Sequence, residues 1–286
     1  QPVCVVPLAR DDRSGHAERA RALTALMTVQ EKLDYIGGVD SFCVRPLQRL
    51  GLPPIWMSDA TSGVRGVDAP VTTFMAAVAM AASFNRQLVG AIATAIAQEC
   101  RSVGVSVLLG PGVNLARVPT CGRNFEYMGE DPYLAGEMAS AYAVAAQQAG
   151  VIPTIKHYAC NNSEYDRHKT DSVVDERTLR ELYLKAFSRV ISHGVLGLMT
   201  SYNLINGTYA SENRHLLEDI LRGEWGFDGM VVSDWNSLYS STEVVKCGVD
   251  IEMPCARWMS PKRLKPLLDS KEISIEDIDR DRKSVV

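Results

Sequence analysis

Short apolar runs bounded by turn residues recur along the chain and alternate with longer segments of helical spacing. Met230–Val232 is such a run, which follows Gly229 and ends abruptly in Ser233, Asp234 and Trp235. Runs of this length are typical of strands that are buried on both faces. Their alternation with helical segments predicts a parallel sheet whose strands are joined by right-handed crossovers.

The spacing of apolar residues and the turn residues around them place these elements along the chain. We expect strands at 53–57, 105–109, 152–155, 196–200, 230–232 and 249–253. We expect helices at 19–33, 74–82, 86–103, 131–148, 179–191, 213–222 and 262–268. Residues 1–15 look like a loose lead-in, and a charged tail follows the last helix. A TIM-type (β/α)8 barrel needs eight strands, so six predict an irregular or incomplete α/β barrel.

Two of the predicted helices carry capping signals at their first turns. Asp131 precedes Pro132, a pair that suits the cap and the first position of a helix. Asp175 and Thr178 both mark the start of the helix near 179, and Glu181 lies three residues after Thr178. The second arrangement is the pattern of a capping box. No repeat or linker interrupts the chain, so we predict that residues 1–286 form one domain.

Composition narrows the classes of function. The net charge is −4 and 22% of the residues are charged, so no basic surface points to nucleic acid. No run approaches the roughly 18 apolar residues of a membrane helix. The seven cysteines are widely spaced and form no CxxC pair, which favours scattered buried thiols over disulfides or a zinc site. Metal-protease, P-loop and dinucleotide motifs are missing from the sequence, so it implies no cofactor or metal.

Polar residues stand where the predicted strands end. These residues are Asp59, Lys156, His157, Tyr202, Asp234 and Glu252. The loop after the 105–109 strand adds further charged and amide side chains, at Arg117, Arg123, Asn124, Glu126 and Glu130. The carboxyl ends of parallel barrel strands share one face, and cations, carboxylates and aromatics gathered there suit a polyhydroxylated ligand.

Each of these residues also has a purely structural alternative. Asp234 has the position of a helix cap, and Asp59 that of a loop cap before a glycine. Lys156 and His157 suit a surface pair, and Arg123 with Glu126 suits an exposed ion pair. Their common position at the strand ends is what favours the functional interpretation.

Several long motifs, in order, resemble the N-terminal barrel domain of glycoside hydrolase family three, in its β-glucosidase branch. The matching stretches are 110–137 (GPGVNLARVPTCGRNFEYMGEDPYLAGE), 155–168 (IKHYACNNSEYDRH), 173–184 (VVDERTLRELYL), 199–213 (MTSYNLINGTYASEN), 221–235 (LRGEWGFDGMVVSDW) and 248–254 (GVDIEMP). The resemblance covers most of the chain from about residue 20 to residue 255. It implies a TIM-like barrel that hydrolyses terminal β-D-glucosyl units of a β-glucoside or oligosaccharide with retention of configuration.

The resemblance also implies a role for individual positions. Asp234 matches the nucleophile, which nearby Arg and Lys charges are expected to keep ionised. Substrate-binding positions are implied at Asp59, Arg65, Arg123, Lys156, His157, Met199, Tyr202 and Trp235. Asp rather than Glu at position 59 favours glucose over xylose. The family also favours a periplasmic or extracellular location, and the sequence indicates no oligomeric state.

The chain departs from the family pattern in three places. The usual Gly-Pro after Asp59 is replaced by 60–63 (ATSG), which makes the place of Arg65 less secure, and 71–85 lacks the usual aromatic pattern. In this branch the acid/base glutamate belongs to a second, α/β-sandwich domain, and the chain stops where that domain would begin. We therefore expect impaired turnover and leave the acid/base residue unassigned.

Asp166 and His168 are the local candidates for that proton donor. They occupy the place of the Asp-x-His dyad that serves the single-domain N-acetylglucosaminidase branch. A single-domain β-N-acetylglucosaminidase and a non-catalytic sugar-binding barrel therefore remain as alternative functions.

Overall fold

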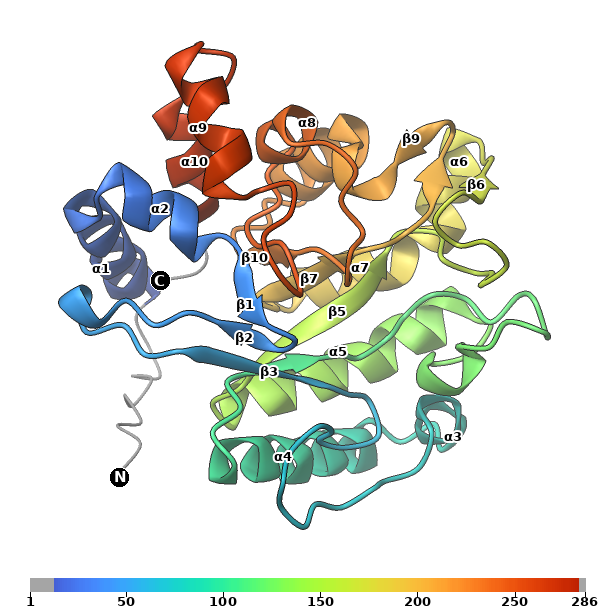
Figure 1. The fold of residues 1–286 in the computed structure, drawn as a ribbon. Coiled ribbons are helices and arrows are strands. Elements are labelled where there is room, and N and C mark those ends of the chain that lie inside the picture. Colours follow the sequence, from blue (N-terminus) through green and yellow to red (C-terminus); the bar gives the residue numbers. More distant parts are fainter. Residues whose placement is uncertain (1–12, 283–286) are drawn as a thin grey trace.

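The computed structural model describes residues 13–282, which form a curled sheet surrounded by helices (Figure 1). The main sheet has the order β1-β2-β3-β4-β5-β7-β10. Its strands are β1 (Gly38–Asp40), β2 (Cys43–Val44), β3 (Ile55–Asp59), β4 (Val107–Leu109), β5 (Ile152–Tyr158), β7 (Gly197–Thr200) and β10 (Met230–Val232). A small second sheet contains β6 (Asp171–Ser172), β8 (Leu204–Ile205) and β9 (Thr208–Tyr209).

Helices connect most of the strands. The α-helices are α1 (Arg13–Leu26), α2 (Val29–Tyr35), α3 (Ala77–Ala82), α4 (Arg86–Ser102), α5 (Pro132–Gln148), α6 (Glu176–Thr178), α7 (Lys185–Ser192), α8 (Thr242–Lys246), α9 (Pro261–Asp269) and α10 (Ile275–Arg282). π-Helical turns occupy Leu179–Tyr183 and His215–Glu224, and 3-10 turns occupy Gln48–Leu50, Asn124–Glu126 and Ala210–Glu212.

The sheet is a barrel that is irregular in two respects. β2 runs antiparallel to both of its neighbours, whereas the strands from β3 through β10 are parallel. The expected strand at 249–253 forms no regular ladder. It nevertheless closes the ring, because Ile251 bridges Val232 of β10 and Glu252 bridges Gly37 before β1, both in parallel. The predicted irregular (β/α)8 barrel is thus confirmed.

Alternation along the strands divides the apolar residues into two cores. Met57, Leu109, Met199 and Val232 belong to the cluster inside the barrel, while the intervening Leu108 belongs to the cluster under the helices. Successive strand residues face opposite sides of a sheet, and both sides are covered in a barrel. This explains why the strand sequences are mostly apolar, with polar residues concentrated near their carboxyl ends.

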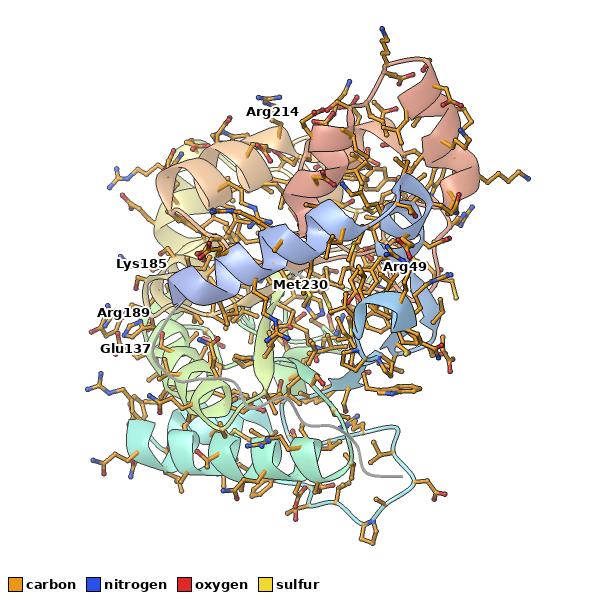
Figure 2. All side chains as sticks on the ribbon, turned by 90° about the vertical axis from the view of Figure 1, so that its left-hand side faces the viewer. Arg49, Glu137, Lys185, Arg189, Arg214 and Met230 are labelled. Atoms are coloured by element: carbon orange, nitrogen blue, oxygen red, sulfur yellow. The ribbon has the colours of Figure 1, made fainter. Side chains whose placement is uncertain are left out.

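The outer helical layer is held by packing and by ion pairs, among them a cluster around Glu137. α4 packs on α5, and α5 packs on α7 (Figure 1). The carboxylate of Glu137 on α5, of which 9% is exposed, accepts hydrogen bonds from Arg86 at 2.7 Å and Arg189 at 2.5 Å. Figure 2 shows Glu137 and Arg189 at adjoining positions on the outer surface. The cluster therefore ties α5 to α7 and to the start of α4.

Several sequence-based expectations are wrong at the ends of the chain. The expected helix at 19–33 is two helices, because Thr28 and Glu31 form a capping box that starts α2. The expected charged tail contains α10, where Ile278 is fully buried and Asp279 accepts a hydrogen bond from Lys32 at 2.6 Å. Of the expected lead-in, residues 1–12 lie outside the described part and 13–15 belong to α1.

The capping predictions have mixed outcomes. Asp131 caps α5 and Pro132 begins it, as predicted. Asp175 caps α6 by accepting from the Thr178 backbone at 3.0 Å, so Thr178 lies inside the helix and its predicted capping box is wrong.

Most of the cysteines follow the prediction of scattered thiols. Five of the six described cysteines are buried, Cys255 is exposed, and all six are free, while Cys4 lies outside the described residues. Within residues 13–282, no helix is long and apolar enough to span a bilayer.

Glu252 illustrates how the closing segment is stabilised. Its side chain is buried and accepts backbone N–H groups from Arg257, Trp258 and Met259 at distances between 2.7 and 3.0 Å. Burial raises its pKa, and these three N–H donors act in the opposite direction. The carboxylate therefore stabilises the turn that follows the closing segment. The prediction that it belongs to the polar residues of the barrel mouth is wrong.

Replacement of Glu252 by Ala would remove the acceptor of three backbone N–H groups, of which that of Met259 is buried and those of Arg257 and Trp258 are partly buried. Each such group costs about 1–3 kcal/mol, so we expect Glu252→Ala to lower the free energy of unfolding by roughly 3 kcal/mol. Urea denaturation followed by circular dichroism measures this loss. Glu130→Ala, at an exposed position, is the matched control and should change stability by less than about 0.5 kcal/mol. Equal stabilities of the two variants would contradict the assigned role.

Candidate active site

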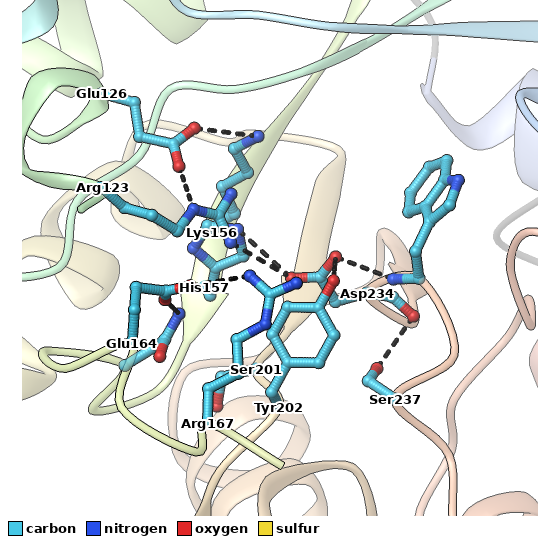
Figure 3. A network of polar contacts seen from close by, with 12 residues as sticks. Arg123, Glu126, Lys156, His157, Glu164, Arg167, Ser201, Tyr202, Asp234 and Ser237 are labelled. Atoms are coloured by element: carbon cyan, nitrogen blue, oxygen red, sulfur yellow. Dashed lines mark hydrogen bonds and ion pairs between the residues drawn. The ribbon is translucent and has the colours of Figure 1, made fainter. Parts of the chain in front are cut away.

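Asp234 follows β10 and lies nearly buried at the mouth of the barrel, with 8% of its side chain exposed. Its two carboxylate oxygens differ in their contacts (Figure 3). Oδ1 accepts the Tyr202 hydroxyl at 2.8 Å and the Trp235 backbone N–H at 2.7 Å. Oδ2 lies 3.7 Å from Arg123 and 3.4 Å from His157 Nε2, and it has no hydrogen-bond partner among the described residues.

A chain of alternating charges surrounds this carboxylate. Glu126 is buried, and its carboxylate pairs with Arg123 on one side and with Lys156 at 3.3 Å on the other. Lys156 is 2% exposed and lies 3.6 Å from Asp59. The predicted Arg123–Glu126 pair therefore exists, but it is buried inside the site. Lys156 and His157 are likewise buried in β5 rather than placed as a surface pair.

The pKa values in this network depend on burial as well as on neighbouring charges. Burial raises the pKa of Asp234, and the opposing charges of Arg123 and Lys156 only partly offset that effect. Arg123 and Lys156 thus lower the pKa of Asp234, in the expected direction, but by less than burial raises it. Burial, reinforced by the charges of Arg123 and Lys156, holds the pKa of His157 well below its ordinary value. His157 is thus neutral near pH 7 and acts as a hydrogen-bonding group.

The backbone of β5 is fixed at His157 by one side chain. Asn114 donates to the His157 carbonyl at 2.9 Å and accepts the His157 N–H at 2.8 Å. Tyr127 Oη lies 3.2 Å from Nδ1 of the same histidine. The backbone is thus held by two hydrogen bonds and the ring by one contact, and Nε2 lies 3.4 Å from Asp234 Oδ2.

A cavity of about 260 Å³ opens beside the network. It is lined by Asp59, Ala60, Thr61, Ser62, Arg65, Arg123, Phe125, Glu126, Glu164 and Arg167. Asp59 is half exposed at the end of β3. The Ser58 hydroxyl accepts the Arg65 N–H at 2.8 Å, which fixes the loop so that Arg65 reaches the same cavity. Two sequence-predicted residues therefore meet here despite the unusual loop sequence.

Two predicted substrate-binding residues lie elsewhere in the mouth. Met199 is 1% exposed and packs with the apolar cluster inside the barrel, below the polar network. Trp235 packs against that cluster and against Phe42, at 5.0 Å between ring centroids. Its indole N–H donates to the Ser41 carbonyl at 2.8 Å.

Asp166 and His168 do not pair with each other. Asp166 lies 3.4 Å from Lys169, and about half of its side chain is exposed. His168 Nδ1 lies 2.9 Å from the Tyr239 hydroxyl. Burial and the charge of Arg167 lower the pKa of His168, so at neutral pH it lacks the proton that a general acid must donate.

Known proteins are similar to this chain in sequence and in fold. The profile of the glycosyl hydrolase family 3 N-terminal domain matches residues 39–286. The chain is 39% identical over 266 residues to thermostable β-glucosidase B of Acetivibrio thermocellus, covering 89% of the chain and 35% of the relative. A β-glucosidase of Rhizobium radiobacter is 43% identical over 234 residues, or 80% of the chain and 29% of the relative.

Solved structures agree with the sequence relatives. Kluyveromyces marxianus β-glucosidase in complex with glucose is 37% identical, with a TM-score of 0.90 over 93% of this chain and 33% of that one. Thermotoga neapolitana β-glucosidase 3B with glucose gives 33% identity and a TM-score of 0.89, over 93% and 42% of the two chains. The chain belongs to glycosyl hydrolase family 3. It spans about a third of the length of the curated relatives it matches.

Two residues of this family 3 site were not assigned a role from the sequence. The Arg167 guanidinium lies 3.9 Å from the centroid of the Tyr202 ring and donates to Glu164 at 2.7 Å. Both side chains come from the loop after β5, whose shape follows no periodic pattern. In the sequence, only the charged residues of this loop, which follow the motif at 155–158, indicated that it could take part in the site.

The variant Asp234→Asn tests how much the buried charge of Asp234 lowers the stability of the fold. A pKa raised on folding means that the folded state binds more protons, so the Asp234 carboxylate lowers stability above its folded pKa. Asn carries no such charge. The stability of Asp234→Asn relative to the wild type should therefore increase as the pH rises from about 4 and then level off. Urea unfolding at a series of pH values measures the difference, and a difference that falls with pH would contradict this balance.

Proposed function

We propose that this chain is the sugar-binding barrel of a retaining β-glucosidase in which Asp234 is the nucleophile. The observation that carries the proposal is the asymmetry of the Asp234 carboxylate. Oδ1 is engaged by Tyr202 and the Trp235 backbone, whereas Oδ2 has no hydrogen bond within the described residues. The hydrogen bonds to Oδ1 fix the carboxylate, while the lone pairs of Oδ2 remain available. An oxygen in this state is suited to attack an anomeric carbon.

The cavity next to Asp234 supports a glucosyl unit as the substrate. Asp59 and Arg123 line it, with Lys156 3.6 Å from Asp59, and their carboxylate and guanidinium groups suit charge-assisted hydrogen bonds with neighbouring sugar hydroxyls. Two structural relatives carry glucose by their own descriptions. The proposed substrate is therefore a terminal, non-reducing β-D-glucosyl residue of a glucoside or oligosaccharide.

The reaction proceeds in two displacements. Oδ2 forms a bond to the anomeric carbon while the glycosidic bond to the leaving oxygen breaks, which gives a glycosyl-enzyme ester on Asp234. Water then attacks the same carbon and gives a proton to the group that protonated the leaving oxygen, which releases glucose and the free carboxylate. Tyr202 and the Trp235 N–H hold the carboxylate still in both steps.

The proton donor for the leaving group is proposed to lie outside residues 13–282. Burial alone would raise the pKa of Glu126, but Lys156 and Arg123 outweigh it and lower the pKa, so Glu126 stays ionised. Glu164 pairs with Arg167 at 2.7 Å. A general acid needs the opposite environment, one that raises its pKa. We therefore propose that a second domain supplies the acid and that turnover of natural glucosides is impaired without it.

Trapping of the intermediate tests the nucleophile. A 2,4-dinitrophenyl 2-deoxy-2-fluoro-β-glucoside has a leaving group that departs without protonation, so the 286-residue chain should react with it and stop at the glycosyl-enzyme. Mass spectrometry of a digest should place the adduct on Asp234, and Asp234→Asn should carry none. If the wild-type chain binds glucose but forms no adduct, it is a non-catalytic sugar-binding barrel.

Leaving-group dependence tests the missing acid. We expect the chain to cleave dinitrophenyl β-glucoside and to leave cellobiose essentially unchanged, because only the disaccharide needs a proton donor. His168→Ala should not alter this contrast. Strong cellobiose hydrolysis that is lost specifically in His168→Ala would overturn the proposal, and a preference for the matching N-acetylglucosaminide would support the hexosaminidase alternative.

A further inference from the structure

Tyr202 is held, at its backbone carbonyl and at its ring, by side chains to which the proposed reaction assigns no role. The Tyr239 hydroxyl donates to the Tyr202 carbonyl at 2.9 Å, and His168 Nδ1 lies 2.9 Å from that hydroxyl. The His168 ring also packs edge-on against the Tyr202 ring, at 4.7 Å between centroids and 64° between planes. Tyr209 stacks on Tyr239 at 3.5 Å and 14°.

These four aromatic residues come from different loops. His168 lies in the loop after β5, Tyr202 follows β7, Tyr209 ends β9, and Tyr239 lies in the loop after β10. Tyr202 is 4% exposed. The group therefore connects the loop after β5 to the loops after β7 and β10, next to Asp234.

The hydrogen bonds determine which nitrogen of His168 carries its proton. A tyrosine hydroxyl has one proton, and that of Tyr239 is used in donation to the Tyr202 carbonyl. His168 Nδ1 must then be the donor to the Tyr239 oxygen. Because the imidazole is neutral, Nε2 carries no proton.

We propose that His168 and Tyr239 are positioning residues for the nucleophile. They fix the Tyr202 ring in the orientation in which its hydroxyl donates to Asp234 Oδ1, which leaves Oδ2 to react. This inference rests on the proposed function of Asp234. It assigns to His168 a role in orienting the Tyr202 ring rather than in acid/base catalysis.

A loss of positioning has a defined electrostatic consequence. The groups that face Asp234 are Arg123 from the loop after β4, Lys156 and His157 from β5, and Tyr202 after β7. His168 and Tyr239 also interact electrostatically with Asp234. The Tyr202 hydrogen bond lowers the pKa of Asp234. If Tyr202 becomes free to turn away, the pKa of Asp234 rises, and the pH at which the nucleophile becomes ionised rises with it.

The experiment compares Tyr239→Phe, Tyr202→Phe and the double variant in the 286-residue chain. Labelling by the dinitrophenyl 2-fluoro-glucoside gives a maximal rate and a half-saturation concentration. We expect Tyr239→Phe to lower the maximal rate roughly fivefold, the factor of one net hydrogen bond, with little change in half-saturation. The acidic limb of the rate should move to higher pH. In the Tyr202→Phe background, Tyr239→Phe should have no further effect.

Two variants of His168 distinguish its N–H group from its bulk. His168→Asn keeps an N–H donor near the position of Nδ1 and should retain most of the labelling rate. His168→Leu keeps a side chain of similar size without a donor and should behave like Tyr239→Phe. Tyr133→Phe removes a hydroxyl from an exposed residue of α5 and is the control, which should label at the wild-type rate.

A second readout does not depend on activity. Carbon-13 NMR of the Asp234 carboxyl, assigned with Asp234→Asn, should show its titration shifted upward in Tyr239→Phe and further upward in Tyr202→Phe. If wild-type Asp234 is not labelled, the proposed function fails, and the NMR titration still tests the positioning. The inference is overturned if Tyr239→Phe and His168→Leu leave the titration unchanged, or if the two tyrosine substitutions act additively on the labelling rate.

Discussion

The burial of a single carboxylate sets the layout of the barrel mouth. Asp234 is nearly removed from solvent, which raises its pKa and opposes its ionisation. A buried charge needs partners, and Arg123, Lys156 and the Tyr202 hydroxyl provide them from three other segments. The cations need partners in turn, and the buried Glu126 lies between them. The polar network is therefore one connected unit whose members stabilise each other, and its position follows from where β10 ends.

Much of this unit could be predicted from the sequence, because strand ends in a parallel barrel obey a simple geometric rule. Four residues at strand ends, each of which follows or ends an apolar run, are Asp59, Lys156, Tyr202 and Asp234. The structure brings Lys156 to 3.6 Å from Asp59 and joins Tyr202 to Asp234 by a hydrogen bond. The same rule failed at Glu252. Its run forms only single bridges, and the chain then turns so that residues 257–259 direct their N–H groups at the carboxylate. Position at a strand end does not determine which way a side chain points.

The rest of the site depends on loop contacts that leave no periodic pattern in the sequence. Arg167 and Tyr202 are 35 residues apart, yet one lies over the ring of the other. His168 and Tyr239 are 71 residues apart and share a hydrogen bond. The spacing of apolar residues predicts which elements form, but it carries no information about such pairs. The same limit explains the division of the expected 19–33 helix, since the capping box at Thr28 acts locally within a continuous helical pattern.

The charges around Asp234 make its neighbours unsuited to donate a proton. Arg123 and Lys156 favour ionised carboxylates, and Glu126, which contacts both, has a lowered pKa as a result. A carboxylic acid near the leaving group needs a site without such cations. His168 is equally unsuited, because burial and Arg167 keep it neutral and its Nδ1 proton is committed to Tyr239. If Asp234 is the nucleophile, the same charges that serve it require the acid to come from a different environment, beyond the network that the barrel provides.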